Sequence, residues 1–294
     1  VGLFVNGLAT DNSDFSSKKE LLREELKELT PAATIDDPST PQHMAFNWLV
    51  TYDRIIKLPM DPALNQRYGA LVIYFAMTKN LDLAADSLLG GDEHECDWGF
   101  FNCIDFGTRP DRQITSINME PTSMKTLPPE IGLLTALESL DLSVLGELES
   151  LPSNLTSLGS LKSLDVSRNV LGSIPTVIYE LSSLEYLDLS LNELEGTIDE
   201  ALWNLSQLQF LSLENNHLTG HVPTNAMDSL SRLEQLNLGF NNLSGKVPPF
   251  YGLVSAIFEY NYFTGEIPAV FNESKSSMNT LRLEHLDLAW NKLS

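Results

Sequence analysis

The second half of the sequence repeats a short pattern, and this periodicity constrains the fold more than any other feature of the chain. Leu184 to Ile198 places leucine, asparagine and glycine at the same offsets as Leu208 to Val222, 24 residues later (208 − 184). Leu233 to Pro248 repeats the pattern once more. Weaker copies begin at Ile114, Leu137, Leu161, Leu253 and Leu283, so eight units run to the end of the chain. Such self-similarity is typical of a stacked array rather than of a compact domain.

The leucines of each unit predict a strand that is buried on one face. In each Leu-x-x-Leu-x-Leu segment the last leucines alternate with polar residues, which is the period of a half-buried strand. One such unit cannot bury its leucines alone, so the units must stack and form a parallel sheet along one side. The second half of each unit then returns over the opposite side. The predicted fold class is therefore an α/β solenoid whose parallel sheet lines a concave face.

An asparagine follows the strand in most units, where the chain must turn sharply. A buried amide can both donate and accept hydrogen bonds there, so it can satisfy the turn and the neighbouring coil. We therefore predict a structural ladder rather than a ligand site at Asn169, Asn192, Asn216, Asn241, Asn261 and Asn291. The first two units have Thr122 and Leu145 at this position, as expected of atypical terminal repeats.

The region before the repeats predicts a helical cap, because a solenoid exposes its leucine core at each end unless something covers it. Residues 14–29, 40–50 and 62–77 have patterns typical of helices with apolar faces. We expect a flexible segment at 1–13, a capping region at 14–113 and about eight repeats at 114–294, the last one incomplete. The extra residues 271–280 between two units predict a surface loop.

The chain contains two cysteines, Cys96 and Cys103, with six residues between them just ahead of the first repeat. A zinc site needs four ligands and a redox pair normally has two intervening residues, so a disulfide is the preferred interpretation. Acceptor triplets for N-glycosylation begin at Asn154, Asn204, Asn242 and Asn272. Disulfide and glycans together indicate the secretory pathway and an extracellular or cell-surface location.

Charge and hydropathy exclude some partners. Eighteen basic and 40 acidic residues give a net charge of −22, which disfavours nucleic acid and anionic lipid. The longest apolar stretch, residues 69–77, is too short to cross a bilayer. The chain begins at Val1 rather than at methionine, which suggests a removed signal segment, the tail of one, or an artificial start.

These motifs resemble a known family, the plant-type leucine-rich repeat ectodomains of receptor kinases, receptor-like proteins and polygalacturonase inhibitors. The resemblance rests on Leu-x-Gly-x-Val-Pro at residues 218–223 and 243–248 and on the Cys-x-Trp of residues 96–98. The family's cap usually reads Cys-x-Trp-x-Gly-Val-x-Cys, whereas this chain has Phe100 and Phe101 in place of the glycine and valine. Residues 40–49 and 66–71 look like the leucine-rich repeat proteins of diatoms and related algae.

The resemblance implies a horseshoe-shaped, secreted or membrane-tethered recognition module, often with a membrane span and sometimes a kinase beyond the repeats. The last residues, 291–294, fall within a repeat, so more protein is expected to follow or the end was trimmed. A membrane tether would then lie outside this chain. The sequence gives no indication of the oligomeric state.

The side chains between the strand leucines tile the concave face, where we expect a ligand. The position just before the ladder asparagine becomes aromatic toward the C-terminus, and a second column of the same face is also aromatic. The candidate ligand-binding residues are Arg168, Tyr186, Phe210, Phe240, Tyr260 and Trp290. Exposed aromatics are common anchors for peptide, protein or glycan ligands, although each ring could simply cover its neighbour.

A further column of the face carries mostly acidic residues: Asp141, Asp165, Asp188, Ser212, Asn237 and Asp287. These carboxylates could bind calcium or a basic ligand, but solubility and strand-edge hydrogen bonding explain them better. No nucleophile with a base, no phosphate loop and no metal ligand set is recognisable, so we expect neither catalysis nor a cofactor.

Three functions are compatible with this pattern. The first is a receptor-like ectodomain that captures a peptide, protein or glycan. The second is a secreted inhibitor of a cell-wall-degrading enzyme, and the third is an adhesion or cell-wall structural module.

Overall fold

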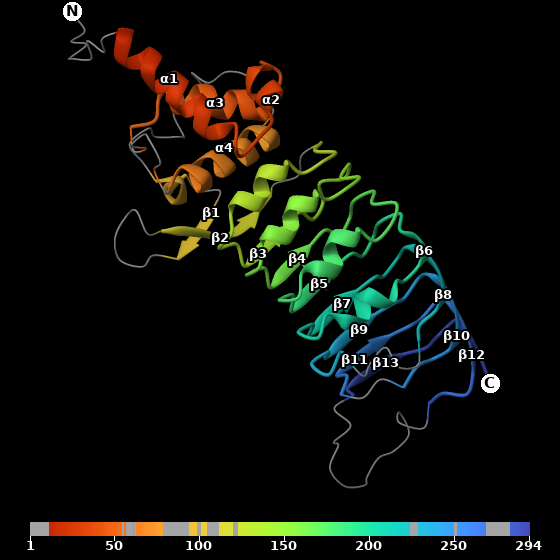
Figure 1. The fold of residues 1–294 in the computed structure, drawn as a ribbon. Coiled ribbons are helices and arrows are strands. Elements are labelled where there is room, and N and C mark those ends of the chain that lie inside the picture. The colour runs from red at the N-terminus through yellow and green to blue at the C-terminus, as the bar shows by residue number, and fades with distance from the viewer. Residues whose placement is uncertain are drawn as a thin grey trace, which may run out of the picture.

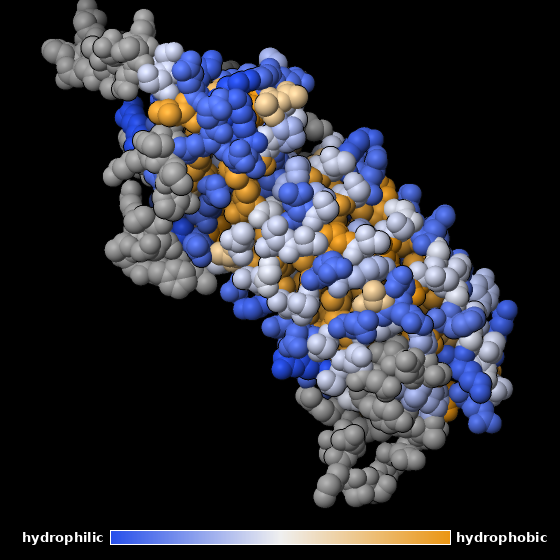
Figure 2. All heavy atoms as spheres, in the orientation of Figure 1, coloured by the Kyte–Doolittle hydropathy of each residue, from blue (hydrophilic) through white to orange (hydrophobic). Residues whose placement is uncertain are grey.

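The protein consists of a helical cap followed by a curved stack of coils (Figure 1). The computed structural model describes residues 12–54, 56, 61, 63–78, 94–98, 101–104, 112–119, 123–223, 229–249, 252–268 and 283–294. Hydrophobic residues run as a band through the cap and the coils, with hydrophilic residues around them (Figure 2). Within the described helices, none is long and apolar enough to cross a membrane.

A nine-stranded sheet runs along one side of the stack, in the order β1-β2-β3-β4-β5-β7-β9-β11-β13. Its strands are β1 (Phe101–Ile104), β2 (Gln113–Asn118), β3 (Ser139–Asp141), β4 (Ser163–Asp165), β5 (Tyr186–Asp188), β7 (Phe210–Ser212), β9 (Gln235–Asn237), β11 (Ser255–Ile257) and β13 (His285–Asp287). Leu187 pairs with Leu211 and Leu211 with Leu236, and all three are buried. The predicted solenoid with a parallel sheet is confirmed, and we call the solvent side of this sheet the concave face.

A second sheet of five parallel strands, in the order β14-β12-β10-β8-β6, was not predicted from the sequence. It contains β6 (Glu195–Thr197), β8 (His217–His221), β10 (Asn242–Lys246), β12 (Tyr262–Gly265) and β14 (Lys292–Leu293). Its strands coincide with the Leu-x-Gly-x-Val-Pro segments, whose glycine turns with a positive φ, as at Gly220 (83°). Hydroxyls connect successive strands, since Thr219 Oγ1 donates to the carbonyl of Gly196 at 3.1 Å.

Short 3-10 helices return the chain over the convex side of the stack. They are η3 (Pro129–Leu133), η4 (Ser153–Ser157), η5 (Thr176–Glu180) and η6 (Glu200–Asn204). A proline or Asp199 precedes each of them, and the Asp199 carboxylate caps the backbone N–H of Ala201 at 2.8 Å. These 3-10 helices make each coil wider on the convex side than at the sheet, and this difference in width curves the stack.

Each ladder asparagine holds two coils together from the interior. Asn216 is representative: its Nδ2 donates to the carbonyls of Leu189, Leu213 and Glu214 at 3.1, 3.0 and 3.2 Å. Its Oδ1 accepts the backbone N–H of Leu194 at 3.0 Å. Asn169, Asn192, Asn241, Asn261 and Asn291 make the same kinds of bond.

The cap contains α1 (Asn12–Leu26), α2 (Ala32–Asp36), α3 (Pro41–Thr51), α4 (Leu64–Thr78) and η1 (Glu95–Asp97). Three of these helices lie where the sequence predicted them, with ends shifted by one to three residues, whereas the short α2 was not predicted. The α3 helix begins at Pro41, and Thr40 Oγ1 accepts the N–H of His43 at 3.1 Å. The cap's strand β1 pairs antiparallel with β2, so the cap closes the N-terminal edge of the sheet.

Candidate functional site

The residue before each ladder asparagine has a left-handed backbone. The φ values lie between 52° and 60° at Val144, Arg168, Leu191, Asn215, Phe240, Tyr260 and Trp290. This conformation is costly for residues other than glycine, but in six of these coils the bonds of the following asparagine impose it, whereas Val144 is followed by Leu145. All seven side chains are exposed, so the geometry of the turn presents this column to solvent at the margin of the concave face.

Three aromatic rings in this column form a continuous stack, which we call the C-terminal stack: Phe240, Tyr260 and Trp290. The centroids of Phe240 and Tyr260 are 4.5 Å apart with an interplanar angle of 14°, and those of Tyr260 and Trp290 are 5.3 Å apart at 18°. Phe240 and Tyr260 remain 40% and 41% exposed despite the stacking. The rings shield each other's faces and offer their edges to solvent.

Tyr186 and Phe210 form a second stacked pair, on β5 and β7, with centroids 4.4 Å apart at 9°. They line a shallow groove of about 420 Å³ together with Glu185, Gln209, Glu234 and Gln235. Burial, together with the negative charges of Asp188, Asp165 and Asp141, raises the pKa of Tyr186 to about 12. The hydroxyl therefore stays protonated and donates to the Asp188 carboxylate at 3.5 Å.

The six candidate residues do not gather at one point. Tyr186 and Phe210 lie on the strands themselves, whereas the C-terminal stack lies in the column at the strand ends, and among the described residues no ring contact joins the two groups. Arg168 is exposed in the same column as the stack, but two coils before the coil of Asn215. The concave face thus has two separate aromatic surfaces.

The acidic column serves the turns of the coils. The carboxylates of Asp141, Asp165, Asp188 and Asp287 each accept the backbone N–H two residues further on, at 2.8–2.9 Å. Asn237 accepts the N–H of Gly239 in the same way. Within the described part of the chain, no three acidic, histidine or cysteine side chains converge on a position for a metal ion.

The larger groove of the described surface, about 920 Å³, lies between the cap and the first coils. Its walls come from α3, α4 and residues 123–129, and they are mostly apolar. Convergent polar groups normally fix the orientation of a ligand, and this groove offers few, with Lys125 as its charged residue. The concave face is therefore the candidate functional site.

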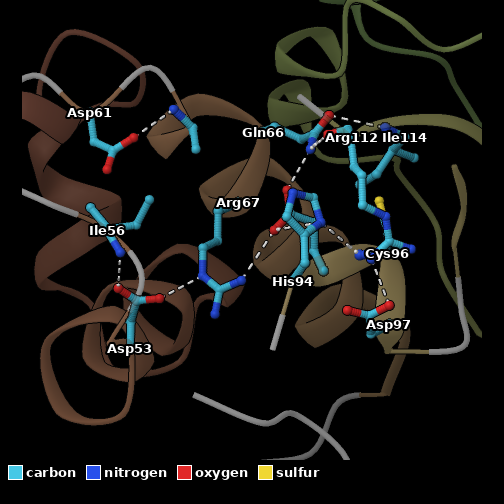
Figure 3. Close-up of polar contacts among 12 residues, drawn as sticks. Asp53, Ile56, Asp61, Gln66, Arg67, His94, Cys96, Asp97, Arg112 and Ile114 are labelled. Atoms are coloured by element: carbon cyan, nitrogen blue, oxygen red, sulfur yellow. Dashed lines mark hydrogen bonds and ion pairs between the residues drawn. The ribbon is translucent and has the colours of Figure 1, made fainter. Parts of the chain in front are cut away.

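The cap contains a buried ionic cluster around Arg67 (Figure 3). Arg67 Nε donates to Asp53 at 2.6 Å and its NH1 donates to Glu95 at 3.1 Å, and all three side chains are buried. The guanidinium carbon lies 5.2 Å and 5.0 Å from the ring centroids of Trp48 and Trp98. Burial lowers the pKa of the neighbouring His94, which opposes its protonation. Because solvent does not reach the carboxylates, the cluster is suited to holding the cap together rather than to chemistry.

Other predicted positions are distributed as follows. Asn154, Asn204 and Asn242 are exposed, in η4, η6 and β10, whereas Asn272 and the insertion at 271–280 lie outside the described residues. Thr122 and residues 1–11 of the N-terminal segment also lie outside the described residues. Cys96 is disulfide-bonded, and the side chain of Cys103 is outside the described part.

The sequence pattern did not single out Glu214 and Glu259, which stand in the coils before and after that of Gly239. Glu214 and Glu259 lie in the column next to the C-terminal stack, and the Asn237 side chain donates to Glu214 at 2.8 Å. Their place on the concave face could have been predicted, because each glutamate stands two positions before a ladder asparagine.

A family model described as "Leucine-rich repeat region" matches residues 113–289. The chain belongs to the leucine-rich repeat family. Its repeats are of the plant type, because the similar solved structures come largely from plants.

A plant ice-binding protein has a TM-score of 0.65 at 29% identity, covering 78% of this chain and 72% of that one. The ectodomain of the Arabidopsis receptor kinase HAESA, in complex with an extended IDA peptide hormone, has a TM-score of 0.54 at 28% identity and covers 61% of this chain. The ectodomain of GASSHO1/SCHENGEN3 from Arabidopsis thaliana, in complex with CASPARIAN STRIP INTEGRITY FACTOR 2, has a TM-score of 0.50 at 28% identity, again over 61%. This chain spans 30% and 21% of the two receptor chains.

Proposed function

We propose that this chain is a non-enzymatic recognition module that captures a peptide or protein segment on its concave face, with the C-terminal stack as the main anchor. Two similar receptor ectodomains are described in complex with a peptide hormone or an integrity factor, which supports this class of ligand.

The observation that carries the proposal is the exposed stack of Phe240, Tyr260 and Trp290. Each ring is fixed by its neighbour and by a backbone that the asparagine ladder holds, so little conformational entropy is lost when a ligand binds. Large aromatic side chains supply much of the binding energy at protein interfaces. A rigid aromatic edge about three coils long suits an extended polypeptide lying along the sheet.

A selection of displayed random dodecapeptides against the immobilised protein tests this function. We expect the enriched peptides to bind the wild type and to lose at least about tenfold in affinity toward a Tyr260→Ala/Trp290→Ala variant. Tyr262→Ala is the matched control, because Tyr262 is 48% exposed but lies on β12 of the other sheet. The proposal fails if no peptide is enriched, or if the double variant binds the enriched peptides as well as the control does.

We also infer that the module is extracellular and is stabilised by a disulfide between Cys96 and Cys103. The bonded state of Cys96 supports an oxidising compartment. The exposure of Asn154, Asn204 and Asn242 leaves these positions accessible to glycosylation. Mass determination of the protein secreted from a eukaryotic host, before and after reduction and deglycosylation, tests both inferences.

A further inference from the structure

Carboxylates border the C-terminal stack on its concave side. Glu259 immediately precedes Tyr260, and Glu214 occupies the equivalent position two coils earlier. The backbone N–H of Phe240 donates to the Glu259 carbonyl at 2.9 Å, and that of Tyr260 donates to the Ala289 carbonyl at 2.9 Å. These bonds place the coils in register, so the column that contains Glu214, Gly239 and Glu259 runs beside the C-terminal stack.

Gly239 is the residue of this column that has no side chain between the two glutamates. It lies between Glu214 and Glu259, and an added Cβ would be 3.4 Å from Glu259 Cγ and 3.3 Å from Asn237 Oδ1. The side chains of Asn237 and Glu259 therefore lie against Gly239 and cover it, and Asn237 also keeps Glu214 in place. The surface beside Phe240 thus carries one carboxylate from the coil before it and one from the coil after it.

The carboxylates of this surface have no ion-pair partner in the described part of the chain. Among the described residues, no lysine or arginine forms an ion pair with Glu214, Glu259 or Asp287. Burial, and then the negative charges of Asp287 and Glu214, raise the pKa of Glu259, whereas His285 acts in the opposite direction. Like charges held together in this way attract a cation more strongly than an isolated carboxylate does.

We propose that the C-terminal stack and the carboxylates of Glu214, Glu259 and Asp287 form a subsite for an arginine side chain of a bound polypeptide. This proposal rests on the proposed function and specifies its ligand. The hydrocarbon stem of arginine packs against the exposed ring edges of Phe240 and Tyr260, while the planar guanidinium donates to the carboxylates. An acidic segment is excluded by repulsion.

Fluorine NMR of protein labelled with 5-fluorotryptophan tests the subsite directly. The chain has four tryptophans; Trp48, Trp98 and Trp203 are at most 4% exposed, whereas Trp290 is 71% exposed. The probe is a synthetic dodecapeptide pool with arginine fixed at every third position and uncharged residues elsewhere. A second pool has citrulline, the neutral isostere, in place of arginine.

We expect the arginine pool to shift the Trp290 resonance, with an apparent affinity at least about tenfold higher than that of the citrulline pool. Glu259→Gln and Asp287→Asn should each reduce that affinity by about fivefold, and added salt should weaken it. Glu200→Gln, an exposed carboxylate in η6, is the control and should have no effect.

The possible failures separate the two proposals. If both pools shift the Trp290 resonance equally and neither substitution matters, the stack binds peptides but the arginine subsite is wrong. If the arginine pool binds without moving the Trp290 resonance, the subsite is also wrong. If neither pool and no selected peptide binds, the proposed function falls with it.

Discussion

At the scale of single residues, the coils from Asn169 onward depend on the ladder asparagine and on the left-handed residue that precedes it. The asparagine satisfies carbonyls of two coils, and the cost of the positive φ before it is about 1–3 kcal/mol for a residue other than glycine. Because that residue is exposed in each coil, its side chain is free to vary from Val144 to Trp290 without changing the fold. The column can therefore acquire a binding surface while the scaffold stays constant.

Asn216→Ala tests the ladder. The substitution leaves the N–H of Leu194 without its partner in the interior and removes one of the two asparagine donors from each of the Leu189 and Leu213 carbonyls. We expect a loss of about 3 kcal/mol in the free energy of unfolding, measured by urea denaturation. Asn204→Ala, at an exposed position in η6, is the control and should leave the midpoint almost unchanged; equal effects of both substitutions would contradict the role of the ladder.

Asp165→Asn tests the electrostatics of the acidic column. Burial and the negative charges of Asp188 and Asp141 raise the pKa of Asp165. The carboxyl of Asp165 thus has a higher pKa in the folded state than in the unfolded state. Such a group contributes its full stability at a pH below the unfolded-state pKa, and this contribution is lost as the pH rises through the folded-state pKa. We therefore expect the variant to melt about 2 °C higher than the wild type at pH 7 and at the same temperature near pH 3. A lower melting temperature at pH 7 would contradict this account.

At the scale of elements, the convex 3-10 helices approach one another closely. An added Cβ on Gly132 of η3 would lie 2.6 Å from the backbone oxygen of Asn154 in η4, so an alanine there must push the two coils apart. Gly132→Ala should therefore reduce the free energy of unfolding by about 1–3 kcal/mol. Gly172→Ala is the control, because nothing lies within 4 Å of its added Cβ. Similar denaturation midpoints for the two variants would show that the coils are less tightly stacked than described.

The elements of the cap are joined by the Arg67 cluster, which connects α4 with η1 and with the segment after α3. Arg67→Met keeps the bulk of the side chain but leaves Asp53 and Glu95 buried without a counter-charge. The expected loss in the free energy of unfolding is about 3–5 kcal/mol. Arg23→Met removes a largely exposed pair with Asp36 and should change the melting temperature little. A wild-type melting temperature for Arg67→Met would refute the structural role of the cluster.

Some strands of the protein were predicted from the sequence and others were not. The period of the leucines predicted the parallel strands of the eight repeats and their register at Leu187 and Leu211, because a half-buried strand has a clear alternation, but it did not predict the antiparallel strand β1 of the cap. The second sheet was not predicted, since its strands are short and Gly196 and Thr197 of β6 are exposed, so no alternation marks them. The separation of the Tyr186–Phe210 pair from the C-terminal stack depends on which column each ring occupies, and composition does not reveal that.

At the scale of the whole molecule, the coils form one curved scaffold with a continuous interior. Leucines from the cap boundary to the last coils belong to a single hydrophobic core. The concave face of such a solenoid is a long surface, and its groove at Tyr186 and Phe210 is open, which suits an extended ligand rather than a small metabolite. The net charge of −22 and the unpaired carboxylates beside the C-terminal stack favour a basic ligand.

Hydroxyl-radical footprinting of the protein saturated with a selected peptide tests the central claim, that the ligand lies on the C-terminal stack. In the free protein Tyr260 and Tyr262 are similarly exposed, at 41% and 48%, but Tyr260 lies in the turn after β11 whereas Tyr262 lies on β12. We predict that the peptide slows the oxidation of Tyr260 and Trp290 several-fold and leaves that of Tyr262 unchanged. Protection of Tyr262, with Tyr260 and Trp290 oxidised at the rate of the free protein, would contradict the account.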